Sequence, residues 1–190
     1  GEPIPNAHVY INQKVYEDYP LSNNTNATTI SNVKGEFTLP SILDGAEYVY
    51  LLKEGFTIAQ YPLDYSMDIV MTEGGILEGR ILYGDSVPTE KTMIIAKDVD
   101  NGRYYKWGKI DENGYFSITE LMGKNYRLTV LINNASGKRI GEYSLLEPVE
   151  AVDGTARTYD FSIPLGTGTI EGELLENGKA PVITHGLLCV

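Results

Sequence analysis

The sequence has very few of the residues on which most catalytic and metal sites depend. Cys189 is the only cysteine, and His8 and His185 are the only histidines. One cysteine excludes an internal disulfide and a zinc site built from several cysteines. Neither histidine belongs to a Ser or Cys pattern typical of a catalytic triad, and His8 falls on the outward side of an alternating segment. We therefore expect no enzymatic activity, no cofactor and no tightly bound transition metal.

Long apolar runs and clusters of basic residues are also missing. No stretch approaches the ~20 apolar residues that span a bilayer, so we expect this segment not to insert into a membrane. The 26 Asp and Glu residues outnumber the 15 Lys and Arg residues, and the net charge is −11. Because the basic residues are scattered along an acidic chain, nucleic acid is not an expected partner. No segment keeps the apolar spacing of a helix, so we also expect little helix.

Short segments of alternating apolar and polar residues fill the chain instead. Ala7, Val9 and Ile11, for example, share one side of such a segment. Asn-Gly pairs at 101–102 and 113–114 are strong signals for tight turns between strands. This pattern predicts an all-β protein of antiparallel β-sandwich domains. For the second half we expect strands near 76–82, 92–98, 104–110, 115–119, 126–132, 139–146 and 158–163.

Two motifs occur twice at the spacing of a small domain. Leu-Glu-Gly-Arg-Ile-Leu at 77–82 reappears as Ile-Glu-Gly-Glu-Leu-Leu at 170–175, 93 residues later. Residues 32–37, ending in Gly-Glu-Phe, reappear as 111–116, ending in Gly-Tyr-Phe, 79 residues later. Such self-similarity is typical of repeat architectures. We predict a sandwich lacking its first strand over 1–73, a complete second repeat over 74–165, and the first strand of a third, truncated repeat within 166–190.

This division leaves the strands unbalanced between the repeats. Residues 1–73 lack a counterpart of the strand at 76–82, whereas 169–175 form such a strand without a domain of their own. Free strands and unpaired sheet edges favour strand addition between chains. We expect the 169–175 strand to pair with a sheet edge, and the unpaired edge of 1–73 in another copy is one hypothesis for its partner.

The opening residues 1–9, Gly-Glu-Pro-Ile-Pro-Asn-Ala-His-Val, resemble the G-x-P-I-x-N-A-x-V start of carboxypeptidase-regulatory-like domains. Residues 32–37 with Ile42, Gly45 and Tyr48 resemble the downstream pattern of that family, and Gly55-Phe56 resembles its closing pair. The second half keeps Asp111, Gly114, Phe116, Leu121, Gly123 and Tyr126. The resemblance implies a transthyretin-like, Ig-like β-sandwich in both repeats and a secreted or cell-surface location. It also implies a role as a spacer, adhesin stalk, receptor extension or accessory domain, and it brings no catalytic residues.

Tyr105 and Trp107 are the candidate ligand-binding residues, in the densest aromatic stretch of the chain. They share one side of the expected strand at 104–110. Exposed on a sheet face, they would form a stacking platform for a glycan or a partner protein. The alternative, which we favour, is that Trp107 is a buried anchor under a neighbouring strand or domain joint, since so large a side chain is usually largely buried.

Asp98, Asp100 and Asp111 are candidate calcium ligands near two turns. Calcium needs six to eight oxygen ligands, several of them carboxylates. The Asp98-Val99-Asp100-Asn101-Gly102 segment lacks the later acidic position of a calcium loop. Turns in which an Asp side chain bonds to its own backbone explain the same residues, and we favour that interpretation.

The leading functional hypothesis is a non-enzymatic module that spaces or presents something else in a secreted or cell-envelope protein, with other repeats of the same protein as its partners. The alternative is a carbohydrate- or protein-binding accessory module of a larger secreted enzyme, using Tyr105 and Trp107 to hold a glycan or a cell-surface protein. Fold alone does not assign function, so the site must decide between them.

Overall fold

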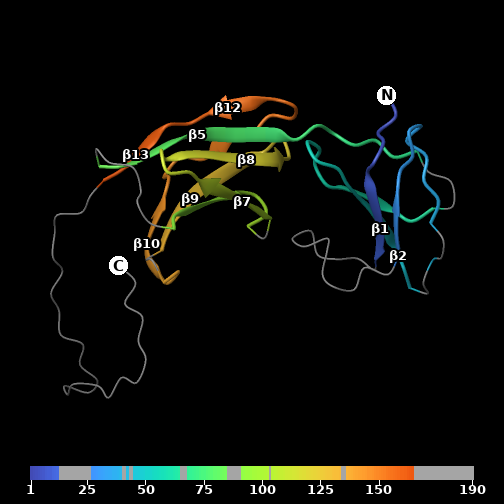
Figure 1. The fold of residues 1–190 in the computed structure, drawn as a ribbon, viewed down its shortest axis with the longest axis horizontal. Helices are drawn as coiled ribbons and strands as arrows, with labels where there is room; N and C mark the ends of the chain where they lie inside the picture. The colour runs from blue at the N-terminus through green and yellow to red at the C-terminus, as the bar shows by residue number, and fades with distance from the viewer. Residues whose placement is uncertain are drawn as a thin grey trace, which may run out of the picture.

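The chain folds as an all-β protein in the computed structural model, which describes residues 1–12, 27–39, 42, 45–64, 68–84, 91–102, 104–133 and 136–164. These residues form strands, turns and extended segments, and none of them is helical (Figure 1). The expectation of an all-β chain with little helix is therefore confirmed for the described part. The predicted strand at 169–175, together with His185 and Cys189, lies outside the described residues.

The first half of the chain forms a four-stranded antiparallel sheet. The strands are β1 (His8–Asn12), β2 (Ala27–Ile30), β3 (Tyr48–Leu52) and β4 (Ala59–Pro62), in the order β2-β1-β3-β4. Ala7, Val9 and Ile11 are buried, as their alternation predicts. Val9 packs with Val49 and Leu51 of β3 in a small core. Burying side chains of this size contributes roughly 1.5–3 kcal/mol each.

The second half forms a larger, curled sheet of nine strands (Figure 1). The main path runs in the order β10-β9-β6-β7-β8-β5-β12, while β11 pairs with β9 and β13 pairs with β5. Because the sheet curls, inward residues from both ends of this path share one core. The strands are β5 (Gly75–Tyr83), β6 (Met93–Asp98), β7 (Tyr105–Ile110), β8 (Tyr115–Leu121), β9 (Asn125–Asn133), β10 (Arg139–Ser144), β11 (Val149–Glu150), β12 (Ala156–Thr158) and β13 (Phe161–Ile163).

The prediction of purely antiparallel pairing is wrong at β5. Both β12 and β13 run parallel to it, and they replace the single strand expected at 158–163. The two short strands are separated where the Asp160 carboxylate accepts a hydrogen bond from the Arg80 N–H at 2.7 Å. A side chain thus takes the place of a backbone acceptor. Alternation of apolar residues looks the same in parallel and antiparallel strands, so the sequence did not reveal this pairing.

Gly79, the central residue of the repeated Leu-Glu-Gly-Arg-Ile-Leu motif, allows this close parallel packing. A Cβ atom at Gly79 would lie 2.1 Å from the Tyr159 carbonyl oxygen and 3.1 Å from Cε1 of Phe116. Leu77 and Ile81, on the same side of β5, are fully buried. The motif therefore has two core residues around one position where no side chain fits.

The halves also share a turn with matching hydrogen bonds. Oδ1 of Asn32 accepts the N–H groups of Lys34 and Glu36 at 2.8 and 3.0 Å. Seventy-nine residues later, Oδ1 of Asp111 accepts those of Asn113 and Tyr115, both at 2.8 Å. Positive φ angles of 74° and 82° at the glycines 35 and 114 complete both turns. The second repeated motif is therefore one structural turn used twice.

Strand order around these turns matches as well. In the first half Val9 pairs with Thr29 on one side and with Leu51 on the other. In the second half Ile94 pairs with Gly108 and Val130. The order β2-β1-β3-β4 thus corresponds to β7-β6-β9-β10, and the register of the first three strands matches as well.

We predict that Gly79→Ala lowers the free energy of unfolding by about 1–3 kcal/mol, because the new methyl group must displace backbone atoms of Tyr159. Urea denaturation measures the change. Gly141→Ala is the matched control, since its Cβ would find its nearest neighbour, in Ile132, at 3.5 Å, an ordinary contact. Equal stability of the two variants would contradict the role given to Gly79.

Candidate functional site

The outer side of β7 presents the aromatic pair singled out in the sequence. Tyr105 and Trp107 alternate with inward residues and are 37% and 45% exposed. Their ring centroids lie 6.0 Å apart at an interplanar angle of 83°, an edge-to-face contact. Both rings therefore keep surface available to a ligand while holding each other in place.

The favoured interpretation of Trp107 as a buried anchor is wrong. The inward position next to it belongs to Gly108, where a Cβ would lie 2.6 Å from Cγ1 of Ile118 and 2.8 Å from Cγ2 of Ile94. The core beneath β7 is thus already filled by neighbouring strands. Because alternation gives Gly108 the inner side, Trp107 must face outward.

Apolar side chains on the adjacent strand extend this surface. Ile95 lies directly opposite Trp107, and Met93 lies opposite Lys109. Met93 is 36% exposed and Ile95 is half-buried. We call the surface formed by Met93, Ile95, Tyr105 and Trp107 the aromatic face. It offers flat apolar area to a sugar ring or to apolar side chains of a partner.

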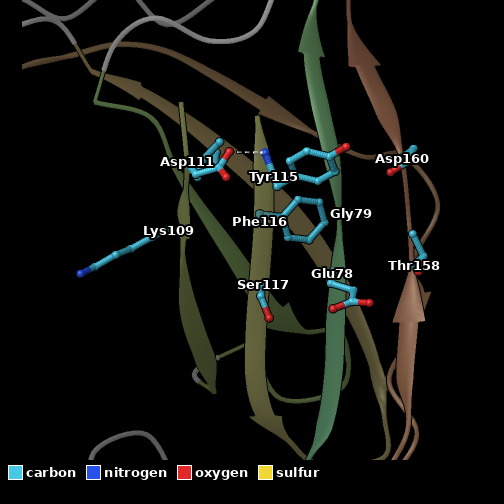
Figure 2. A pocket seen from close by; sticks show the side chains of 10 residues that line it. Glu78, Gly79, Lys109, Asp111, Tyr115, Phe116, Ser117, Thr158 and Asp160 are labelled. Carbon is cyan, nitrogen blue, oxygen red and sulfur yellow. Dashed lines mark hydrogen bonds between the residues drawn. The ribbon is translucent and has the colours of Figure 1, made fainter. Parts of the chain in front are cut away.

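An open depression of about 790 Å³ lies beside the aromatic face on the same sheet. Lys109 borders it, and Figure 2 shows the Phe116 ring beside Gly79 at its centre, with the Lys109 side chain pointing away. Tyr115 is 54% exposed, and the Arg80 guanidinium lies over its ring, 5.4 Å from the centroid. The depression is lined by Glu78, Gly79, Lys109, Ile110, Asp111, Tyr115, Phe116, Ser117, Thr158 and Asp160. Its hydroxyl and carboxylate groups can form hydrogen bonds with a polar ligand next to the rings.

The candidate calcium ligands are not brought together. Asp98 ends β6, whereas Asp111 follows β7, which runs antiparallel to β6, so the two carboxylates lie at opposite ends of the strand pair. Across the described ranges, no group of three or more His, Cys, Asp or Glu side chains is placed to hold a metal ion. The calcium hypothesis at Asp98, Asp100 and Asp111 is therefore not supported by the geometry.

Turn formation, the favoured alternative, is confirmed at Asp98 and Asp111. Oδ1 of Asp98 accepts the N–H groups of Asp100 and Asn101 at 2.8 and 3.1 Å. Its Oδ2 accepts a hydrogen bond from the Lys124 ammonium group at 3.0 Å. The sequence did not reveal that Asp98 is almost fully buried, at 1% exposure. The only feature of the sequence that could have indicated this burial is the position of Asp98 at the end of an alternating segment, just before a turn.

Burial by itself raises the pKa of the Asp98 carboxyl group. Hydrogen bonds from the Asn101 N–H, the Lys124 ammonium group and the Asp100 N–H outweigh it, so the pKa lies below its ordinary value of 3.8. A carboxyl group whose pKa is lower in the folded state stabilises the fold fully at pH values above its unfolded-state pKa. This stabilisation is lost as the pH falls through the folded-state pKa. Asp98 therefore stabilises the fold at neutral pH and stops doing so in acid.

We predict that Asp98→Asn lowers the free energy of unfolding at about pH 7 by roughly 1–3 kcal/mol, because the buried turn loses a charged acceptor. The difference from the unmodified chain should shrink once the pH drops below 3.8, because the unfolded chain then binds a proton at this carboxyl group before the folded chain does. Urea denaturation across this pH range measures both effects. Asp100→Asn, an exposed neighbour, is the control. A deficit that stays constant down to about pH 2 would contradict this account.

Two buried tyrosines beside Asp98 belong to the core. The Tyr126 hydroxyl donates a hydrogen bond to the Met122 carbonyl at 3.2 Å, whereas the buried Tyr104 hydroxyl has no hydrogen-bond partner among the described residues. Burial first, then the charges of Glu120 and Asp98, raise the pKa of Tyr104 to about 12. Their rings lie 6.2 Å apart and pack in the core of the curled sheet. Both side chains therefore stay neutral and act in packing.

Comparison with known proteins gives little further information. No family model matches the sequence, and no curated protein matches it significantly. Among solved structures, GBS52, the minor pilin of Streptococcus agalactiae, aligns at 18% identity over 91% of this chain and 89% of that chain, with a TM-score of 0.39. A superposition at this score does not establish a shared fold. Within the described part of the chain, no helix is long and apolar enough to cross a membrane.

Proposed function

We propose that the chain is a non-enzymatic structural module, made of two tandem repeats, that spaces or presents other domains of a secreted or cell-surface protein. The observation that supports it best is the hydrogen-bonded joint between the two sheets. Repeat proteins of this kind work through the geometry that each repeat imposes on the next. We also propose, on the motif residues, that both repeats are carboxypeptidase-regulatory-like sandwiches.

The joint is bonded to both sheets. On the first side, the Gly74 N–H donates to the Gly55 carbonyl at 2.8 Å, and Phe56 forms a bridge with Glu73. On the second side, the Glu73 carbonyl accepts the Gly154 N–H at 3.1 Å. Glu73 and Gly74 together form backbone hydrogen bonds with residues of both halves. Neither of them is therefore a free linker residue. Such a connection favours a fixed relative orientation, as a spacer requires.

Steric contact restricts the joint further. A Cβ at Gly74 would lie 2.4 Å from the Cα of Glu120, so the chain passes directly against β8. At Gly75 a Cβ would lie 2.7 Å from the Val152 carbonyl oxygen. The two glycines therefore serve close packing here and do not provide flexibility.

We predict that the two halves tumble as one body. Backbone 15N relaxation should give the same rotational correlation time for amides before Glu73 and after Gly75. Inserting Gly-Ser-Gly-Ser between Glu73 and Gly74 should separate the two values, because it interrupts the joint. The same insertion in the exposed turn at Gly137 is the control and should leave them equal. Unequal values in the unmodified chain would refute the spacer function.

The exposed aromatic face favours a second candidate, a glycan- or protein-binding accessory module. The observation that supports this candidate is that Trp107 is 45% exposed and lies next to Tyr105, with the polar depression beside them. Aromatic residues at the centre of a binding surface commonly contribute most of its affinity.

We predict for this candidate that Trp107→Ala reduces binding to any glycan retained by the unmodified chain on a glycan array by about tenfold or more. The same substitution should change the unfolding free energy by less than about 0.5 kcal/mol, since the ring lies outside the core. Val33→Ala, at an 86% exposed site in the first half of the chain, is the control. Unchanged glycan binding by Trp107→Ala would exclude the aromatic face as the site.

A further inference from the structure

The outer side of the strands β6, β7, β8 and β9 has a charge opposite to that of the whole chain. Its positions, as alternation defines them, are 93, 95 and 97 in β6, 105, 107 and 109 in β7, 115, 117 and 119 in β8, and 125, 127, 129 and 131 in β9. Lys97, Lys109 and Arg127 are exposed there, and none of these positions is an Asp or Glu. A purely basic surface on a chain of net charge −11 indicates selection for an anionic ligand.

Two of these basic residues flank the aromatic pair. Lys97 lies directly opposite Tyr105, and Lys109 is two residues beyond Trp107 on the same side of β7. The rows of the two lysines are four residues apart along the strands, a distance of about 13 Å at about 3.3 Å per residue. Figure 2 shows that the Lys109 side chain points away from the depression. The exposed rings of the aromatic face thus have an ammonium group at each end.

Neither lysine is neutralised by the protein. The described residues offer no hydrogen bond or ion pair to either ammonium group, whereas Lys106 and Lys124 each have a carboxylate partner. Glu78 is two strand spacings, about 10 Å, from Lys109, because both lie opposite Ser117 of β8. Exposed charges at that distance are largely screened by salt. Both ammonium groups are therefore available to a bound anion.

Lys97 also lies directly opposite a second cation, Arg127 of β9. Like charges directly opposite each other destabilise a strand pair. The Arg127 guanidinium donates hydrogen bonds to the carbonyls of Leu145 and Leu146 at 3.2 and 3.0 Å, which satisfy its N–H groups without neutralising its charge. An anion bound beside Tyr105 relieves this repulsion, so the free sheet has an energetic reason to accept one.

We propose that the aromatic face and its two flanking lysines bind a glycan with carboxylate groups directly on its sugar rings, that is, a chain of uronic acid sugars. The sugar rings stack on Tyr105 and Trp107. Their carboxylates accept charge-assisted hydrogen bonds from the ammonium groups of Lys97 and Lys109. The inference rests on the accessory-module candidate, for which it names the class of ligand.

The structure favours this occupant over other anions. β7 is paired with β6 on one side and with β8 on the other, so it has no free edge for an extended peptide. A nucleic acid has a charge on every nucleotide, and its binding depends on neutralising several phosphates. Two lysines on an acidic chain do not provide that. A uronic acid sugar combines one ring with one charge, which matches Tyr105 and its neighbour Lys97.

Tryptophan fluorescence tests the proposal at the site itself, because Trp107 is the only tryptophan of the chain. The full chain is titrated with an oligogalacturonate and with the same oligosaccharide as its uncharged methyl ester. The acid form should give a saturable change and bind about tenfold more tightly than the ester at low salt. This difference should vanish near 1 M salt, where the Debye length is about 3 Å.

Charge-removing variants identify the groups that hold the carboxylates. Lys97→Gln and Lys109→Gln should each weaken binding of the oligogalacturonate by about two- to fivefold and leave binding of the ester unchanged. Lys34→Gln is the matched control, since it removes the same charge at an exposed turn of the first half. All three side chains are exposed, so the variants should fold normally. Equal effects of Lys34→Gln and Lys97→Gln would overturn the proposal.

Three further results would overturn the proposal. The first is no fluorescence response to the acid form, and the second is equal affinity for the acid form and the ester. The third is tighter binding of an oligothymidylate or a polyglutamate peptide, which would assign the surface to another class of polyanion. The accessory-module candidate fails separately, when Trp107→Ala leaves glycan binding on the array unchanged. A glycan surface that ignores charge is thus distinguishable from the absence of a glycan surface.

Discussion

Close backbone packing around β5 holds the larger sheet together. β5 pairs antiparallel with β8 on one side and parallel with β12 and β13 on the other. Only a glycine at position 79 admits the Tyr159 carbonyl between these strands. The Gly84 N–H donates to the Ile163 carbonyl at 3.0 Å, so the first and last strands of this half lie side by side. The first strand of this half is therefore held in place by the last strands of the same half.

Acidic and amide side chains in this chain stabilise turns. Asn32, Asp98 and Asp111 each use one side-chain oxygen to accept two backbone N–H groups. Those groups would otherwise need water or other partners where a strand ends. Such turns fix where each strand stops and hence which residues face the core. The acidic composition at these positions is explained by local backbone geometry, without a ligand.

The sequence predicted the elements and their inner faces well. Ala7, Val9 and Ile11 are buried where alternation places them, because period two in a half-buried strand is a direct consequence of backbone geometry. The repeated Asn32 and Asp111 turns could also be located, since Gly and Asx residues at fixed offsets have few other uses.

Properties that depend on distant neighbours were not predictable. Parallel pairing at β5 is set by where the chain returns after β11, and alternation contains no such information. Trp107 was assigned to the core from its size, but Gly108 occupies the inward position because Ile94 and Ile118 already fill the space beneath it. Tyr48 and Tyr126, matched by their spacing to Gly45 and Gly123, also differ, since Tyr126 is fully buried and Tyr48 is half-buried.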